Sequence, residues 1–317
     1  MESVFNVEDT DEENNRQSSK RKETEEDGPQ SKKKMNSKPI DCIDLTEDEP
    51  ACSHNRNGSD DEANSKLSLI SWNVDGLDTL NLQERARGLC SYLALYTPDV
   101  VFLQELIPQY LQYLKKRAVS YQIVEGNEDG YFTAMMVKRS RIKLQSSEII
   151  SYPTTQMMRN LLCAKVSEDD TNILNSGEDE MRELFFCNPQ VKFLNQELCL
   201  MTSHLESCKD QATERKKQLK VVLEKIMEEP DNMTVIFGGD TNLRDSEEHC
   251  RFTWDTKTNS NKDVSYISRC RFDRIYLRPA RTGVKMTPDH MTLVGMEKLD
   301  CGRYTSDHWG IYCSFNS

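Results

Sequence analysis

The chain has 317 residues, 30% of them charged, and a formal net charge of −12, so it is long enough for one large domain or two ordinary ones. The negative charge is concentrated in residues 1–65, which hold 18 acidic and 9 basic residues, whereas the remainder is close to neutral. A nearly neutral body gives no sign of nucleic-acid binding through bulk charge, so any such binding requires a local basic patch.

The sequence contains no segment of the kind that enters a membrane or directs secretion. No apolar run reaches about 18 residues and no basic-then-apolar leader is present, so we expect neither membrane binding nor secretion. The 11 cysteines form no Cys-x-x-Cys pair, and several of them, such as Cys163, Cys199 and Cys313, lie in strand-like apolar runs. This usage indicates a reducing intracellular compartment with buried thiols, and we expect no zinc cluster.

Residues 1–65 have no hydrophobic periodicity, and we expect a disordered acidic tail there. Two basic clusters, Lys20-Arg21-Lys22 and Lys32-Lys33-Lys34, are separated by nine residues, a spacing that suits a two-part nuclear import signal. The alternative, two solvated charge clusters, stays open. We expect a nuclear protein, with a cytoplasmic fraction as a further expectation.

A second feature of the tail is Ile40–Glu49, in which the only aliphatic cluster of the tail is followed by acids. A short aliphatic strand can add to the exposed sheet edge of a partner, and flanking acids suit a basic groove. The string resembles SUMO-interacting motifs of the Ile-Asp-Leu-Thr type, which implies SUMO as a partner. A chance group of aliphatic residues is the alternative.

From Lys66 the sequence alternates strand-like and helix-like segments. Strands are predicted over Leu67–Trp72, Val100–Leu103, Tyr121–Val124, Phe132–Val137, Ile142–Ile150, Leu161–Val166, Leu198–Ser203, Val235–Phe237, Cys270–Leu277 and Ile311–Phe315. Helices are predicted over Leu82–Leu95, Pro108–Arg117 and Thr213–Glu229. Ser167–Glu183 is predicted to be an exposed loop, and a polar loop holds Trp254-Asp255. Helices and strands that interleave and then give way to strands favour a layered α/β sandwich over residues 66–317.

Polar residues recur where these predicted strands end. They are Asn73, Glu105, His204, Asp240 with Asn242, and Asp307-His308, and Asp273 lies inside a predicted strand. A hard metal ion bound by few carboxylates suits the charge of a phosphodiester. A further carboxylate can deprotonate water, and amides and an imidazolium can hold phosphate oxygens. The set therefore predicts a metal-dependent site for a phosphate ester.

Each of these residues alone has an ordinary structural explanation. Asn73 can cap a turn, Asp273 can pair with a neighbouring arginine, and Trp254 can belong to the core. His204 can be a hydrogen-bonded histidine at the end of a strand. The prediction depends on the whole set and its order.

In that order the motifs resemble the endonuclease/exonuclease/phosphatase superfamily. The motifs are Trp72-Asn73-Val74-Asp75-Gly76, Gln104-Glu105, Ser203-His204, Gly239-Asp240-Thr241-Asn242, the strand of Asp273, and Ser306-Asp307-His308. More closely, Thr202–Ser207, Gly239–Arg244, Thr253–Asp255 and Ser306–Gly310 look like the type 2 tyrosyl-DNA phosphodiesterases. The resemblance extends from about Leu67 to Phe315 and implies a four-layered α/β/β/α sandwich.

The resemblance also implies a role for each matched residue. Glu105 holds Mg²⁺, with Asp307 as a helper, and Mn²⁺ is an expected substitute. Asp240 is the general base, His308 stabilises the transition state, and Asp273 orients the His308 ring. Asn73 and Asn242 contact the scissile phosphate. The residues implied in substrate binding are Asn73, Val74, Asp75, Gly76, His204, Leu205, Glu206, Ser207, Asn242, Leu243, Arg244 and Trp254.

The implied reaction is hydrolysis of the 5′-phosphotyrosyl bond between DNA ends and trapped topoisomerase II, with RNA–protein tyrosyl links as a further substrate. Tyrosine is a comparatively good leaving group because a phenol ionises near pH 10, so no strong general acid is required. The alternatives are another phosphoesterase of the superfamily, such as an abasic endonuclease, and a catalytically weakened SUMO-binding scaffold.

The sequence departs from the family in two regions. It carries an acidic insert over Ser167–Gln196, and the segment Asp245–Phe252 is shorter than the helical segment that family members have there. The second change bears on the site because it directly precedes Trp254.

Overall fold

The computed structural model describes residues 43–44, 66–168, 197–244 and 252–316. The predicted disordered tail and import signal therefore lie outside the described residues, apart from Ile43–Asp44 of the SUMO-interacting-like motif. Most of the acidic insert, from residue 169 to 196, and the shortened segment from residue 245 to 251 also lie outside them.

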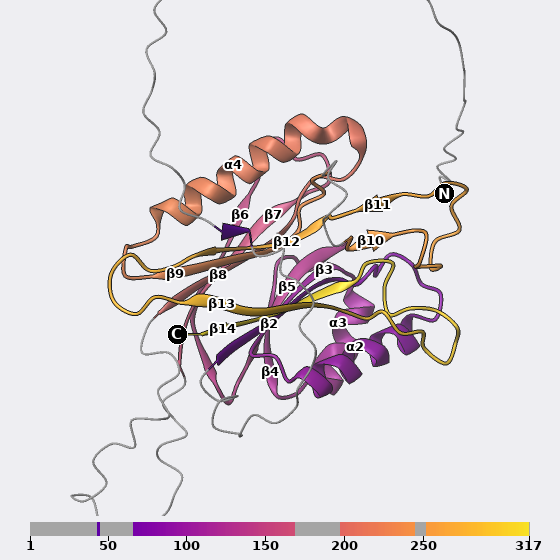
Figure 1. Ribbon diagram of the computed structural model, residues 1–317, viewed down its shortest axis with the longest axis horizontal. Helices are drawn as coiled ribbons and strands as arrows, with labels where there is room; N and C mark the ends of the chain where they lie inside the picture. Colours follow the sequence, from indigo (N-terminus) through magenta and orange to yellow (C-terminus); the bar gives the residue numbers. More distant parts are fainter. Residues whose placement is uncertain (1–42, 45–65, 169–196, 245–251, 317) are drawn as a thin grey trace, which may run out of the picture. The chain divides into compact units, whose positions relative to one another are not determined.

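The described chain forms two six-stranded sheets, a two-stranded ribbon and three α-helices (Figure 1). Sheet A has the order β1-β12-β9-β8-β7-β6, and sheet B has the order β13-β14-β2-β3-β5-β4. The strands of sheet A are β1 Ile43–Asp44, β6 Ile142–Ser151, β7 Asn160–Glu168, β8 Leu198–His204, β9 Thr234–Asp240 and β12 Asp273–Arg278. The strands of sheet B are β2 Lys66–Asn73, β3 Val100–Leu106, β4 Tyr121–Glu125, β5 Phe132–Lys138, β13 Thr287–Val294 and β14 Gly310–Asn316. The ribbon pairs β10 Trp254–Asp255 with β11 Arg269–Cys270. The helices are α2 Leu82–Tyr96, α3 Pro108–Arg117 and α4 Ala212–Glu228, the last preceded by the 3₁₀ turn η2 Lys209–Gln211.

Three hydrophobic cores separate four layers. The central core lies between the two sheets and takes Leu67 and Leu69 from β2 and Ile236 from β9. Ile70 and Trp72 of β2 point the other way, into the core beneath α2 and α3. Val235 and Phe237 of β9 similarly face the core beneath α4. Central strands that bury both faces read as continuous apolar runs, and the predicted α/β/β/α sandwich is confirmed.

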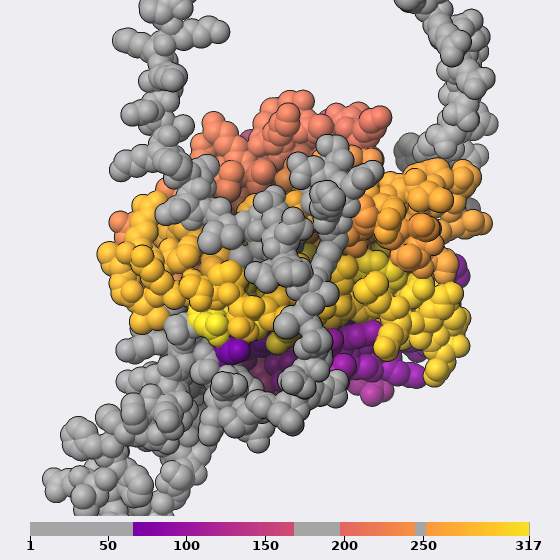
Figure 2. Space-filling model, viewed as in Figure 1, coloured from indigo at the N-terminus to yellow at the C-terminus, as the bar shows by residue number. Residues whose placement is uncertain are grey.

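The chain segment after residue 252 forms a band between α4 and the helices of sheet B (Figure 2). This segment includes two strands that were not predicted. The edge strand β13 contains Pro288 and is mostly exposed or half-buried, so it lacks a strong apolar alternation. Trp254-Asp255, predicted as loop, forms the short strand β10.

One predicted strand is broken in two. Cys270–Leu277 was expected to be continuous, but β11 ends at Cys270 and β12 begins at Asp273. The hydroxyl of Thr253 accepts hydrogen bonds from the backbone N–H groups of Phe272 and Asp273, at 3.0 and 3.1 Å. These bonds hold the backbone at the break, so Asp273 starts a strand and does not lie within one.

The prediction of buried thiols is met in the described residues. Cys163, Cys199 and Cys313 are buried free thiols. No helix among the described segments is both long and apolar enough to cross a membrane.

Candidate active site

The pairing of the strands brings the predicted site residues to one edge of the sandwich. In sheet B, β2 and β3 are parallel and Asn73 lies opposite Gln104, next to Glu105. In sheet A, β8 and β9 are parallel and His204 lies opposite Asp240. The carboxyl ends of these four strands therefore meet at the same edge. The antiparallel strands β12 and β14 enter from the other direction, so Asp273 lies opposite Asp240 and His308 precedes β14.

Two glycines allow this edge to close. A Cβ on Gly239 would lie 2.0 Å from the carbonyl oxygen of Ser203, and a Cβ on Gly76 would lie 2.2 Å from that of Glu105. Only a residue without a side chain fits so close to a neighbouring backbone. The glycine before Asp240 therefore lets β9 approach β8 next to the two residues of the site.

Asn73 links the two central carboxylates. Its side-chain amide donates to Glu105 Oε1 at 3.1 Å and to Asp240 Oδ2 at 3.0 Å. Its side-chain oxygen accepts a hydrogen bond from the backbone N–H of Asp75. The buried amide thus fixes the separation of the predicted metal ligand and the predicted base.

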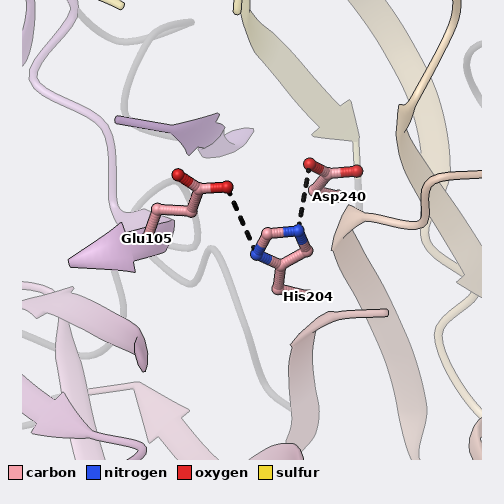
Figure 3. A group of neighbouring side chains, drawn as sticks. All are labelled: Glu105, His204 and Asp240. Carbon is pink, nitrogen blue, oxygen red and sulfur yellow. Dashed lines mark ion pairs between the residues drawn. The ribbon is translucent and has the colours of Figure 1, made fainter. Parts of the chain in front are cut away.

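His204 lies between the same two carboxylates (Figure 3). Its Nε2 is 3.4 Å from Asp240 Oδ2, and its Nδ1 is 3.8 Å from Glu105 Oε1. Burial, followed by the positive charge of Arg159, lowers the pKa of His204 well below its usual value. The guanidinium of Arg159 lies 2.9 Å from Nδ1, where a neutral imidazole can accept its hydrogen bond. His204 is therefore a neutral polar group at neutral pH.

His308 has the opposite electrostatics. Burial by itself disfavours its charged form, but the Asp273 carboxylate, 2.8 Å from Nδ1, raises the pKa of His308 well above its usual value. Its Nε2 is 3.8 Å from Asp240 Oδ2. The structure thus places a charged imidazolium, oriented by Asp273, beside the predicted base.

The carboxylates are buried at a cost that a cation would relieve. Burial, followed by the charge of Asp307, raises the pKa of Glu105 to about 7, and burial, followed by Asp273, raises that of Asp240 to about 6. Among the described residues, no lysine or arginine forms an ion pair with Glu105. Carboxylate oxygens are the ligands that Mg²⁺ prefers. Glu105 therefore fits a hard divalent ion, and its ligand oxygen lies within 4.8 Å of ligand atoms of His204 and Asp240.

Several residues predicted to bind substrate have side chains that are packed in a hydrophobic core or hydrogen-bonded within the protein. Val74 and Leu205 are buried in hydrophobic cores. Glu206 accepts hydrogen bonds from Thr155, from the backbone N–H groups of Gln156 and Met157, and from Gln218. These side chains position the loops at the site, and only their backbone remains for substrate.

The other predicted residues lie at the rim. The indole of Trp254 donates to Asp307 Oδ2 at 3.2 Å, so Trp254 stays attached to the site despite the short segment before it. The Arg244 guanidinium lies over the ring of Phe272. The backbone N–H of Asn242 donates to Asp240 Oδ1, and its side chain donates to the Leu205 carbonyl. Leu243 is half-buried, and its carbonyl accepts a hydrogen bond from Arg274.

Arg159 was missed by the sequence analysis. It is 6% exposed, donates to Ser207 Oγ at 3.0 Å and stacks on Tyr131. Its position depends on the turn between β6 and β7, and nothing in the local sequence distinguishes it from other arginines. Together with His204 and Ser207 it adds a buried positive charge on one side of the site.

Comparison with known proteins agrees with this geometry. The model of the endonuclease/exonuclease/phosphatase family matches residues 70–308. Tyrosyl-DNA phosphodiesterase 2 of Danio rerio is 57% identical to the chain over 329 residues, with 94% of this chain and 82% of that protein covered. The chain belongs to the tyrosyl-DNA phosphodiesterase 2 family, within the endonuclease/exonuclease/phosphatase proteins.

Other members of the tyrosyl-DNA phosphodiesterase 2 family support the same assignment. The Homo sapiens protein is 48% identical over 306 residues, covering 88% of this chain and 78% of that protein. A crystal structure of the Danio rerio protein complexed with single-strand DNA product is 62% identical, with a TM-score of 0.70, and covers 80% of this chain and 100% of that one. The predicted family, fold class and phosphodiester hydrolase are thus confirmed.

Proposed function

We propose that this site hydrolyses the 5′-phosphotyrosyl bond that joins a DNA end to trapped topoisomerase II and leaves a 5′-phosphate for repair of the break. The observation that carries the proposal is the meeting of Asp240, His308 and Glu105 at one edge of the sandwich. The names of the relatives, and the DNA product bound to the Danio rerio protein, support the choice of substrate.

Asp240 is the general base in this proposal. A carboxylate with a pKa near 6 is ionised at neutral pH and still basic enough to take a proton from an attacking water. Asn73 and the backbone N–H of Asn242 hold its two oxygens, so the carboxylate has one orientation. The same two asparagines are proposed to contact the scissile phosphate.

His308 stabilises the charge that develops on the phosphate oxygens. Its imidazolium is held by Asp273 before substrate arrives, and a preorganised donor in a buried site is worth far more than one in water. His204 and Ser207 bind the 5′-phosphate region, and Arg159 reinforces that side with a full charge. The tyrosine leaves as a phenolate or phenol, so no strong general acid is assigned.

Glu105 holds Mg²⁺, or Mn²⁺ in its place, with Asp307 as a helper. When bound, the ion supplies Lewis-acid stabilisation of the phosphate charge. Asn73 keeps the Glu105 carboxylate next to the base. Arg244 and Trp254 at the rim, with Asp75, Gly76 and Leu243 on the adjoining loops, receive the DNA end.

The tail is proposed to bind SUMO through Ile40–Glu49 and to direct the chain to the nucleus, with a cytoplasmic fraction. Pairing of β1 with the edge of β12 supports the view that this motif adopts an extended strand. RNA–protein tyrosyl links are proposed as additional substrates on the basis of the shared 5′-phosphotyrosyl chemistry.

The direct test uses a 5′-phosphotyrosyl oligonucleotide in Mg²⁺. Asp240→Asn removes the base, and we expect a loss of about a thousandfold or more in kcat, with folding retained. Asp289→Asn is the matched control and keeps full turnover, since it removes a carboxylate of β13 that accepts a hydrogen bond from Ser314, far along β14 from His308. Normal turnover by Asp240→Asn would exclude it as the base. Faster cleavage of an abasic-site duplex or a 3′-phosphotyrosyl oligonucleotide would reject the proposed substrate.

A further inference from the structure

A buried threonine with no assigned role holds the backbone beside both members of the Asp273–His308 pair. Thr253 is 1% exposed, and its hydroxyl oxygen accepts hydrogen bonds from the N–H groups of Phe272 and Asp273, at 3.0 and 3.1 Å. Its backbone carbonyl accepts a hydrogen bond at 2.7 Å from the N–H of Trp309, the residue after His308. Thr253 therefore ties the start of β12 to the residue that precedes β14.

The carboxylate of Asp273 depends on its backbone for its position. Its Oδ2 lies 2.8 Å from Nδ1 of His308, whereas its Oδ1 is buried and has no hydrogen-bond partner in the part of the chain that the structure describes. Buried polar atoms are nearly always hydrogen-bonded, so this oxygen is an exception. A carboxylate held through one oxygen can turn unless its Cα is fixed. The hydrogen bond from the Asp273 N–H to Thr253 supplies that restraint.

The backbone of His308 has restraints of its own. Its N–H donates to Ser306 Oγ at 3.1 Å, and its carbonyl accepts a hydrogen bond from the Trp72 indole at 3.0 Å. Neither bond involves the hydroxyl of Thr253. Loss of that hydroxyl should therefore shift Asp273 relative to an imidazole that stays in place.

We propose that Thr253 is a positioning residue whose hydroxyl fixes the backbone of Asp273, so that the carboxylate meets the His308 ring in the orientation that turnover requires. The inference deepens the proposed function and rests on the roles assigned there to Asp273 and His308. It also gives the Thr-Trp-Asp motif a second role. Trp254 reaches the rim of the site through its side chain, whereas Thr253 acts beneath it through backbone hydrogen bonds.

A purely structural role for Thr253 would be to join the ribbon to β12 at the break. Thr253→Val keeps the shape and the backbone carbonyl and removes the hydroxyl acceptor, whereas Thr253→Ser keeps the acceptor. Thr234→Val is the matched control, because Thr234 is fully buried at the start of β9 and its hydroxyl accepts a hydrogen bond from the N–H of Ala280 at 3.1 Å. Both valine variants leave buried N–H groups without their acceptor, but only one of them does so at Asp273.

The experiment measures turnover of a 5′-phosphotyrosyl oligonucleotide by the full chain in Mg²⁺, with thermal melts to check folding. We expect Thr253→Val to lose about a hundredfold in kcat with little change in KM, because a misplacement of about 1 Å has an effect of this size. Thr253→Ser and Thr234→Val should keep kcat near that of the wild type. Should Thr253→Val not fold, Thr253→Cys, whose thiol is a weak acceptor, takes its place.

A double-mutant cycle with Asp273→Asn tests whether Thr253 acts through Asp273. Asp273→Asn by itself should lose most of the turnover, because an amide cannot stabilise the imidazolium as the carboxylate does. In that background, Thr253→Val should change kcat by no more than about twofold, since residues that act as a unit are not additive.

An equally large effect of Thr253→Val in both backgrounds would overturn the inference, because Thr253 would then act on the fold as a whole. Wild-type kcat in Thr253→Val, or an equal loss in Thr253→Ser or Thr234→Val, would also overturn it. Each of these results leaves the proposed function intact. Wild-type turnover by Asp273→Asn would instead overturn the role of Asp273 in the proposed function, and the inference with it, so the two failures are distinguishable.

Discussion

At the scale of single residues, the site is a group of buried charges balanced against one another. The pKa values of Asp75, Glu105 and Asp240 are all raised, in each case first by burial and then by a neighbouring carboxylate. Two histidines at the same edge differ because His308 has Asp273 as a partner and His204 faces Arg159. The partner of each side chain, and not its type, decides which imidazole is charged.

Glu105→Gln tests the cost of the buried carboxylate. Because its folded pKa of about 7 exceeds the ordinary value of 4.5, the folded state binds the extra proton, and the carboxylate destabilises the metal-free protein increasingly as pH rises from about 4.5 to 7. Above pH 7 the penalty is on the order of 3 kcal/mol. We expect Glu105→Gln to melt about 8 °C higher than the wild type in chelator at pH 7.5, and at the same temperature near pH 4.5.

Thermal melts with chelator and with Mg²⁺ provide the measurement. Mg²⁺ should stabilise the wild type and leave Glu105→Gln unchanged, since the variant lacks the proposed ligand. A variant that is less stable than the wild type in chelator at pH 7.5 would contradict the view that Glu105 has no cationic partner of its own.

At the scale of elements, the parallel pairs β2–β3 and β8–β9 bring the site together, and antiparallel β12 and β14 complete it. Every one of these strands delivers a polar residue at the end that faces the same edge. Three residues there, Asp75, Glu105 and Asn242, have positive φ values between 49° and 58°. Non-glycine residues in this conformation are strained, and such strain is concentrated at functional sites.

Gly239→Ala tests the close approach of β9 to β8. The added Cβ would lie 2.0 Å from a backbone oxygen, so the two strands must separate. We expect a loss of about 3 kcal/mol in unfolding free energy and a strong loss of turnover, because His204 and Asp240 are the last residues of the displaced strands.

Gly238→Ala is the matched control for this prediction. Its Cβ would meet only side chains, the nearest being the Phe102 ring at 3.0 Å, which can shift. Denaturant unfolding and turnover of the two variants are compared. Equal stability of both would show that the Ser203 carbonyl does not limit the spacing of these strands.

At the scale of the whole molecule, catalysis and partner binding are assigned to different parts of the chain. All of the proposed site residues lie between Asn73 and His308, whereas the proposed SUMO motif precedes Lys66. The tail strand β1 pairs Ile43 and Asp44 with Leu277 and Tyr276, the part of β12 away from Asp273. Loss of this pairing should therefore not reach the catalytic edge.

Changing Ile43 and Leu45 together to alanine tests this separation. We expect SUMO binding to be lost and hydrolysis of the 5′-phosphotyrosyl oligonucleotide to be unchanged, since aliphatic side chains anchor an added strand. Removal of residues 1–65 should have the same two effects. Calorimetric SUMO titration and turnover give the two readouts. Retained SUMO affinity in the double variant would place the SUMO-binding surface elsewhere.

The sequence by itself determined the layered class, most of the strands and the order of the site motifs. Strands buried on both faces leave long apolar runs, and polar residues directly after such runs mark the ends of strands. Asn73, Glu105, His204 and Asp240 were found in this way. The strand β13 and the break before Asp273 were not found. The strand β13 depends on its pairing with β14, and the break depends on the hydroxyl of Thr253, so neither leaves a local pattern in the sequence.

Only the tertiary structure decided which charges meet. Lys262 and Asp75 are separated by 187 positions in the chain, and Arg159 and His204 by 45. A sequence pattern reports the type of a residue and its face, whereas the pKa of a buried group depends on which distant charges the fold places beside it. The neutral state of His204, the charged state of His308 and the ammonium of Lys262 beside Asp75 are therefore properties of the folded chain.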